Sequence, residues 1–204
     1  MSYCAISKND ALRRQLDSLD KQQLEILIKS YIYGEEEGFG HELVVIAWKE
    51  SNFGKYPMNL EDGRYGSFGP YHVLLEHSMK RHKMHGTWNK SRLAERHLSD
   101  VEFSAKDALT VWKAFYIRNK NTSNQSYRTF AMYNAGVAGI KNAAGKKYAD
   151  DANQRLLVLK DWIIKNDIIN RVIEPARRVI ASSPKHSAKE YRDLKTLRIP
   201  IKKE

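Results

Sequence analysis

Hydrophobic residues recur with helical spacing in most of the chain. In residues 20–37, apolar side chains three and four positions apart predict an amphipathic helix: Leu24, Leu27, Ile28, Tyr31 and Ile32. Residues 41–50 are apolar on every side, which predicts a central buried helix that contains Leu43, Val44, Val45, Ile46, Ala47 and Trp48. Glu50 lies at the carboxyl end of this second helix.

Further helices are predicted beyond residue 69. Pro70 is a favourable first residue for a helix that runs towards Lys83. Ser99 and Glu102 have the spacing of a capping box, which predicts a helix from there to about Arg118. Periodicity predicts three more helices, at residues 125–133, 151–165 and 167–180. The predicted fold class is therefore mainly α.

Residues 51–69 lack helical periodicity and are rich in residues typical of turns, namely Gly54, Pro57, Asn59, Asp62, Gly63, Gly66 and Gly69. A loop of this length in a compact domain usually has a function, and this one directly follows Glu50. We expect a long active-site loop or a small hairpin.

The length of 204 residues fits one domain, residues 1–180, followed by a tail. The tail, residues 181–204, holds seven Lys or Arg against three acidic residues. It is interpreted either as a solvated extension or as a binding element for anionic envelope polymers.

Composition narrows the class of protein. The chain is 42% hydrophobic and 29% charged, which is ordinary for a folded globular protein. Its net charge of +11 predicts attraction to nucleic acid, anionic membranes or bacterial envelopes. A single cysteine, Cys4, excludes a disulfide framework and a cysteine-rich zinc site. We expect no export signal and no transmembrane segment, because the sequence shows neither a signal-peptide pattern nor an apolar run of about 18 residues. A substrate outside the cytoplasm would therefore require another route of delivery.

Glu50 is the first candidate catalytic residue. Cleavage of a glycosidic bond near neutral pH requires a carboxylic acid that keeps its proton, and apolar surroundings favour that protonated form. Glu50 ends an apolar helix, has Trp48 and Phe53 nearby, and opens into a polar loop. An exposed carboxylate at a helix end would give the same local pattern, so the catalytic interpretation of Glu50 depends on other segments of the chain.

Three segments, in order, resemble the lytic transglycosylase and goose-type lysozyme superfamily over about residues 41–139. Residues 44–53, VVIAWKESNF, resemble its catalytic segment, an apolar helix that ends in Glu-Ser followed by an aromatic residue. Residues 66–72, GSFGPYH, resemble a glycine-bounded turn that lines its cleft, with Pro-Tyr-His in place of the usual Leu-Met-Gln. Residues 131–136, AMYNAG, resemble its Ala-Tyr-Asn-Ala-Gly motif.

The resemblance implies a lysozyme-like helical domain that cleaves the β-1,4 bond between N-acetylmuramic acid and N-acetylglucosamine in peptidoglycan. It implies that Glu50 is the catalytic acid and that Tyr133 points its hydroxyl towards that carboxyl. The substrate would be contacted by Ser51, Ser67, Gly69, His72, Asn134 and Gly136, with His72 replacing the usual glutamine as a hydrogen-bond donor. No cofactor and no metal ion are expected.

Two mechanisms differ in their need for a second carboxylate. An inverting hydrolase places a second carboxyl roughly 6.5–9.5 Å from the acid to activate water, and Glu61 or Asp62 could supply it. A lytic transglycosylase needs no such group, because a hydroxyl of the sugar itself attacks and leaves an anhydro end. The Ala-Met-Tyr-Asn-Ala-Gly segment favours transglycosylation.

The expected biological context is that of a bacteriophage endolysin, a bacteriolytic and hence antimicrobial enzyme. Such a protein is made in the host cytoplasm and reaches the wall after holin-type release or as a virion component. We expect a monomer that binds peptidoglycan strands and no nucleic acid. Four histidines, His77, His82, His85 and His97, are interpreted as part of a basic face rather than a metal site.

Two other classes remain open from the sequence. A nucleic-acid-binding protein would explain the charge and the aromatic residues scattered among basic ones, but it gives Glu50 no role. A peptidoglycan-binding module without catalysis would keep the fold and lose the chemistry.

Overall fold

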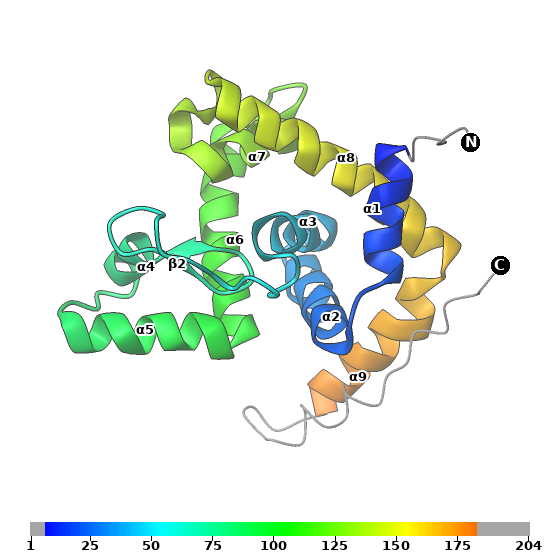
Figure 1. Ribbon diagram of the computed structural model, residues 1–204, viewed down its shortest axis with the longest axis horizontal. Helices are drawn as coiled ribbons and strands as arrows, with labels where there is room; N and C mark the ends of the chain where they lie inside the picture. Colours follow the sequence, from blue (N-terminus) through cyan, green and yellow to red (C-terminus); the bar gives the residue numbers. More distant parts are fainter. Residues whose placement is uncertain (1–6, 183–204) are drawn as a thin grey trace, which may run out of the picture.

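The computed structural model describes residues 7–182 and is mainly helical, which confirms the predicted fold class (Figure 1). Its α-helices are α1 (Lys8–Asp17), α2 (Lys21–Glu35), α3 (Gly40–Ser51), α4 (Leu75–Arg81), α5 (Thr87–Ser99), α6 (Val101–Arg118), α7 (Gln125–Ala135), α8 (Ala143–Lys165) and α9 (Glu174–Ser182). A 3-10 helix, η1 (Gly136–Ile140), follows α7, and a π-helix, η2 (Ile169–Ile173), precedes α9.

Helix α3 lies at the centre of the larger core, as predicted. It packs against α2 and α8, and its residues 44–47 are completely buried. Figure 1 shows α2 and α3 side by side, with α6 on one flank, α7 and α8 above them, and α1 and α9 on the other flank. Glu50 is therefore held by a deeply buried helix, which gives its backbone little freedom to move.

A three-stranded antiparallel sheet forms a second, smaller group with α4 and α5. Its strands β1 (Met58–Asn59), β2 (Ser67–Phe68) and β3 (Val73–Leu74) pair in chain order, with Met58 opposite Phe68 and Ser67 opposite Leu74. A separate apolar cluster holds this group together: Phe68, Leu75, Leu93 and Phe103. Because Phe103 belongs to α6, that long helix joins the two cores (Figure 1). The segment 51–69 thus contains a small hairpin, β1–β2.

Two predicted helix starts are wrong. Pro70 does not begin a helix, because Gly69 (φ +81°) and His72 (φ +44°) adopt left-handed conformations that a right-handed helix cannot contain. The chain passes through a turn and β3 before α4 begins at Leu75. Ser99 is the last residue of α5, and the cap of α6 is Asp100, whose carboxylate accepts the backbone N–H of Phe103.

The remaining boundaries shift for local reasons. Helix α8 begins at Ala143, earlier than predicted, because Asn142 caps a start that is rich in alanine and lysine and shows no apolar stripe. The segment predicted as one helix at 167–180 contains η2 and α9. Helices α1 and α5 were not predicted. Residues 181–182 of the predicted tail belong to α9, and its remainder lies outside the described residues.

A buried polar cluster ties α4, α5 and α6 together. The carboxylate of Asp107 accepts hydrogen bonds from Ser78 Oγ and Arg81 Nε, each at 2.5 Å, and lies 3.3 Å from His97 Nε2. Burial opposes its charge, but hydrogen bonds from His97, Arg81 and Ser78 hold the pKa of Asp107 well below its usual range. His97 is completely buried, so its assignment to a basic surface was wrong.

None of the helices within residues 7–182 combines the length and the apolar character needed to cross a lipid bilayer.

Candidate active site

Glu50 lies in the last turn of α3, where the helix is stopped by two consecutive left-handed residues. Asn52 (φ +51°) and Phe53 (φ +56°) turn their backbone N–H groups back onto the carbonyls of Trp48 and Ala47. Phe53 is buried and its ring stacks on that of Trp48, with 5.9 Å between the centroids. The Glu50 side chain is 17% exposed, so it is neither an open surface carboxylate nor fully enclosed.

Tyr148 of α8 contacts this carboxyl directly. Its hydroxyl donates a hydrogen bond to Glu50 Oε1. Burial and then the charge of Glu50 raise the pKa of Tyr148 well above its usual value, so the hydroxyl remains a donor at any physiological pH. Lys49 lies 5.1 Å from the centre of the tyrosine ring and forms an ion pair of 2.9 Å with Asp151, which fixes α8 against α3. Sequence reasoning missed Tyr148.

His72 approaches the other oxygen of the same carboxyl. Its Nδ1 lies 3.5 Å from Glu50 Oε2, and its Nε2 lies 2.8 Å from the carbonyl oxygen of Tyr56. Burial disfavours the charged ring, but the interactions with Glu50 and Tyr56, with a smaller contribution from the charge of Asp62, raise the pKa of His72 above its usual value. The imidazole therefore contacts the Glu50 carboxyl, and it also lines the pocket described below.

Tyr133 has a different partner from the one expected. Its hydroxyl donates to the carbonyl oxygen of Tyr71 at 3.0 Å instead of to Glu50. Burial, followed by the charge of Glu50, raises the pKa of Tyr133 well above its usual value, so the ring lies within electrostatic range of that carboxyl. Tyr133 therefore stabilises the turn at residues 69–72, and the tyrosine that is hydrogen-bonded to the Glu50 carboxyl is Tyr148.

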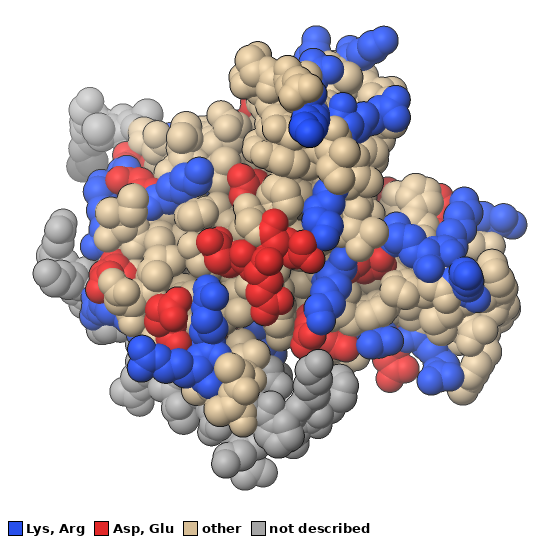
Figure 2. Space-filling view, turned by 180° about the vertical axis from the view of Figure 1, so that it is seen from behind, with Lys and Arg blue, Asp and Glu red and all other residues tan. Residues whose placement is uncertain are grey.

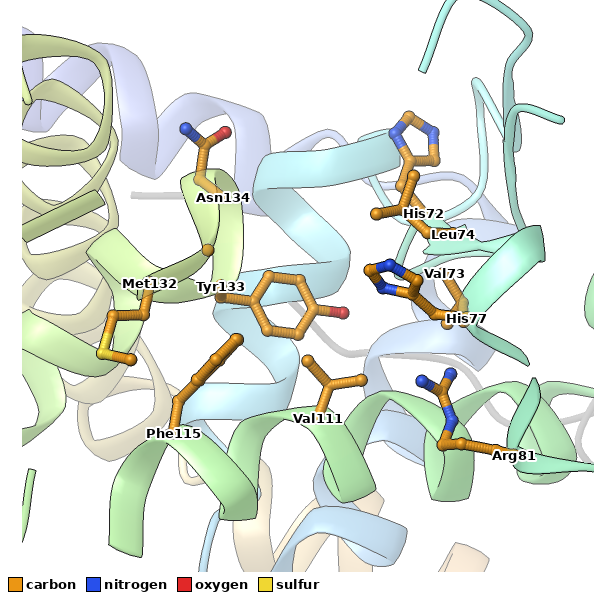
Figure 3. Close-up of a pocket in the computed structure, with 11 residues that line it drawn as sticks. His72, Val73, Leu74, His77, Arg81, Val111, Phe115, Met132, Tyr133 and Asn134 are labelled. Carbon is orange, nitrogen blue, oxygen red and sulfur yellow. The ribbon is translucent and has the colours of Figure 1, made fainter. Parts of the chain in front are cut away.

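A pocket of about 140 Å³ lies beside these groups, between the sheet with α4 on one side and α7 on the other (Figure 3). It is lined by His72, Val73, Leu74, His77, Arg81, Val111, Phe115, Met132, Tyr133, Asn134 and Gly136. Figure 3 shows the Tyr133 ring pointing from α7 towards the β3 and α4 side. Glu50 does not line the pocket, but it contacts His72, which does.

The predicted substrate contacts separate into two groups. His72, Asn134 and Gly136 line the pocket, and Asn134 is exposed there. Ser51, Ser67 and Gly69 are buried. None of the three lines the pocket, and their burial keeps a substrate from reaching them in this conformation.

Ser51 and Gly69 have clear structural roles. The hydroxyl of Ser51 donates to the carbonyl of Pro70 at 2.7 Å and accepts the backbone N–H of Gly54 at 2.7 Å. At Gly69, an added Cβ would lie 2.5 Å from the carbonyl oxygen of His97 and from Ser104 Oγ. Ser67 is completely buried and its hydroxyl has no hydrogen-bond partner among residues 7–182. Ser51 and Gly69 therefore set the path of the loop that presents His72.

The two candidate second carboxylates differ in position. Glu61 is exposed, and its backbone N–H is bonded to the side chain of Asn59. Asp62 is half-buried, and its charge makes a small contribution to the raised pKa of His72. Of the two acids, Asp62 is the one whose charge acts on His72, a residue in contact with Glu50.

Within the described part of the chain, no group of three or more His, Cys, Asp or Glu side chains is arranged to hold a metal ion. In comparisons with known proteins, no family model, no curated protein and no solved structure matches this chain.

Proposed function

We propose that this protein is a peptidoglycan-degrading enzyme with a lysozyme-like fold, which cleaves the β-1,4 bond between N-acetylmuramic acid and N-acetylglucosamine as a lytic transglycosylase. One observation carries the proposal. The three segments that resemble that superfamily meet in space, because Glu50 contacts His72 and the turn of His72 is bonded to Tyr133 through Tyr71. Tyr71 and Tyr133 are 62 residues apart in the sequence, so segments that are distant along the chain lie together beside a pocket.

The chemistry proposed for Glu50 is proton transfer in two directions. Glu50 donates a proton to the glycosidic oxygen as the bond to the anomeric carbon breaks. The C6 hydroxyl of the muramic acid residue then attacks that carbon, and Glu50 takes up the hydroxyl proton, which closes the anhydro ring. Between these steps the Glu50 carboxylate is stabilised by the donor of Tyr148 and by the imidazole of His72.

Hydrolysis is the alternative, and the electrostatic contribution of Asp62 at His72 is what favours it. Its carboxylate acts electrostatically on His72, which itself contacts Glu50. In an inverting muramidase, Asp62 would activate a water on the opposite face of the sugar, while Glu50 would remain the acid.

The net charge of +11 suits binding to an anionic polymer. Seen from behind, acidic side chains gather in the middle of the molecule, with Lys and Arg spread around them (Figure 2). Helix α4, which lines the pocket, and α5, which packs against α4, contain more basic than acidic side chains, namely Lys80, Arg81, Lys90, Arg92 and Arg96 against Glu76 and Glu95. We propose the bacterial wall as the target, reached after holin-type release or from a virion, as for a bacteriophage endolysin.

The decisive variant is Glu50→Gln, tested on purified cell walls. Glutamine keeps an acceptor for Tyr148 but cannot give a proton, so wall solubilisation should fall by roughly 100-fold or more. The exposed Glu95 on α5 offers the matched control, because Glu95→Gln removes the same charge outside the site. If Glu50→Gln and Glu95→Gln lyse walls equally well, Glu50 is not the acid.

Mass spectrometry of the released fragments separates the two mechanisms. Transglycosylation yields anhydro-muramoyl ends that are lighter than hydrolytic ends by one water. With Asp62→Asn, a transglycosylase should keep most of its rate, whereas an inverting hydrolase should lose it. Wild-type protein that releases neither product would refute the enzymatic proposal.

A further inference from the structure

Arg81 presents an unused hydrogen-bond donor at the pocket. It is the last residue of α4, and its Nε is bonded to the buried carboxylate of Asp107. The Nη2 of the same guanidinium is buried and has no hydrogen-bond partner among the described residues. In Figure 3 the guanidinium rises from α4 towards the pocket beside His77.

A buried donor without a partner costs free energy, and most such groups in proteins are satisfied. Arginine remains charged at all relevant pH values and binds carboxylates through paired N–H groups. Because Asp107 engages the Nε side, the Nη2 side of Arg81 is left for an acceptor that residues 7–182 do not supply. The pocket volume of about 140 Å³ is far more than one water molecule occupies.

The rest of the pocket defines the ligand further. None of the described residues that line it carries a carboxylate. His72 and His77 stand on the side of Arg81, although each has an acid beyond the pocket wall, Glu50 at 3.5 Å and Glu76 at 3.6 Å respectively. Opposite them lies an apolar surface formed by Val111, Phe115 and Met132. The lining thus fits a carboxylate attached to a small apolar group.

We propose that this pocket binds a carboxylate of the substrate and that Arg81 is the residue that selects it. This inference rests on the proposed function and adds a specificity to it. In a glycan of alternating N-acetylmuramic acid and N-acetylglucosamine, the lactyl ether of muramic acid carries a methyl group and a carboxyl group. That carboxyl is free where the stem peptide has been removed, and elsewhere the acidic residues of the stem supply the carboxylates.

The test is a binding titration followed by NMR. The ligands are N-acetylmuramic acid, its methyl ester, N-acetylglucosamine and N-acetylmuramoyl-L-alanyl-D-isoglutamine. We expect a carboxylate-bearing ligand to bind roughly tenfold more tightly than the neutral ester and N-acetylglucosamine. Preference for free muramic acid identifies the lactyl carboxylate as the source, and preference for the dipeptide conjugate identifies the stem.

Two variants link any preference to Arg81. Arg81→Gln removes the donor but leaves Asp107 unpaired, so Arg81→Lys is included because it keeps a cation beside Asp107 and lacks Nη2. Both should abolish the preference for a carboxylate. Lys80→Gln, on an exposed neighbour in the same helix, removes one positive charge and should leave the preference unchanged.

Equal binding of acid and ester to the wild-type protein would overturn the inference, and so would an unchanged preference in Arg81→Lys. Wall cleavage by the wild-type protein is measured in parallel. Cleavage without carboxylate preference refutes the role of Arg81 alone, whereas carboxylate preference without cleavage refutes the proposed catalysis and leaves a muropeptide-binding site.

Discussion

The hydroxyl of Tyr148 on α8 donates a hydrogen bond to the carboxyl of Glu50 on α3, across 98 residues of sequence. This contact makes α8 part of the candidate site, although the motifs that suggested the site end before that helix begins. It also distinguishes the role of Tyr148 from that of Tyr133, whose hydroxyl is bonded to the backbone carbonyl of Tyr71.

Tyr148→Phe should therefore reduce wall cleavage more than Tyr133→Phe does. Loss of a hydrogen bond to a charged group corresponds to roughly 10- to 100-fold in rate if the bond acts in the transition state. Rates on purified walls and thermal unfolding midpoints should be compared for both variants. Tyr133→Phe should act mainly on stability, because it leaves the buried carbonyl of Tyr71 without its donor. If Tyr133→Phe reduces the rate of wall cleavage more than Tyr148→Phe does, Tyr133 and not Tyr148 assists Glu50.

Periodicity located most of the helices that build the larger core, although it missed α1 and did not give their exact ends. The continuous apolar run before Glu50 correctly indicated a central helix, since a helix that is apolar all round can only be buried. Hydrophobic periodicity could not predict the left-handed backbone conformations at Gly69 and His72. A histidine with positive φ is set by tertiary contacts, here those of its ring with Glu50 and Tyr56, and not by local propensity.

The candidate site was predictable only where its residues belonged to a recognisable segment. Asn134, Gly136 and His72 do line the pocket. Tyr148 lies on the inner face of α8, where an aromatic residue predicts core packing and nothing more. The polar residues Ser51 and Ser67 resembled cleft residues in sequence, but they point inward. Exposure of each side chain is a property of the packed structure, so residue type alone could not assign it.

Ser51→Ala should destabilise the loop that follows α3. The substitution leaves the carbonyl of Pro70 and the N–H of Gly54 without the Ser51 hydroxyl, which is completely buried. Unsatisfied buried groups of this kind cost about 1–3 kcal/mol in unfolding free energy. Urea denaturation measures the change. Ser99→Ala, which removes an exposed hydroxyl at the end of α5, is the matched control and should cost far less. Equal effects would show that Ser51 has no special structural role.

His72→Asn should change how stability depends on pH. Since the pKa of His72 in the folded protein is raised above its ordinary value of 6.5, protonation of the imidazole stabilises the fold. That contribution is complete below about pH 6.5 and is lost as the pH rises through the folded pKa. Asparagine tolerates the left-handed backbone at this position, so the variant isolates the ring.

The measurement is the unfolding free energy of the wild type and of His72→Asn between pH 5 and pH 9. The advantage of the wild type should be greatest at the acid end and should shrink towards the alkaline end. If the difference in unfolding free energy between the two proteins stays constant over this range, the contact with Glu50 does not favour protonation of the His72 imidazole.

Asp107→Asn tests the buried cluster beneath the pocket. At neutral pH the variant should lose roughly 3–5 kcal/mol of unfolding free energy, because it leaves the Arg81 guanidinium without its buried carboxylate. The pKa of Asp107 in the folded protein is far below its ordinary value of 3.8, so its stabilising contribution is present above pH 3.8 and is lost as the pH falls through the folded pKa. The advantage of the wild type should therefore be constant from pH 7 to about pH 5 and should narrow only in stronger acid.

Asp161→Asn, which breaks an exposed ion pair with Arg13 and Lys165, provides the comparison and should have a much smaller effect. Equal losses in the two variants, measured by urea denaturation across this pH range, would show that burial of Asp107 adds nothing to the strength of its ion pair.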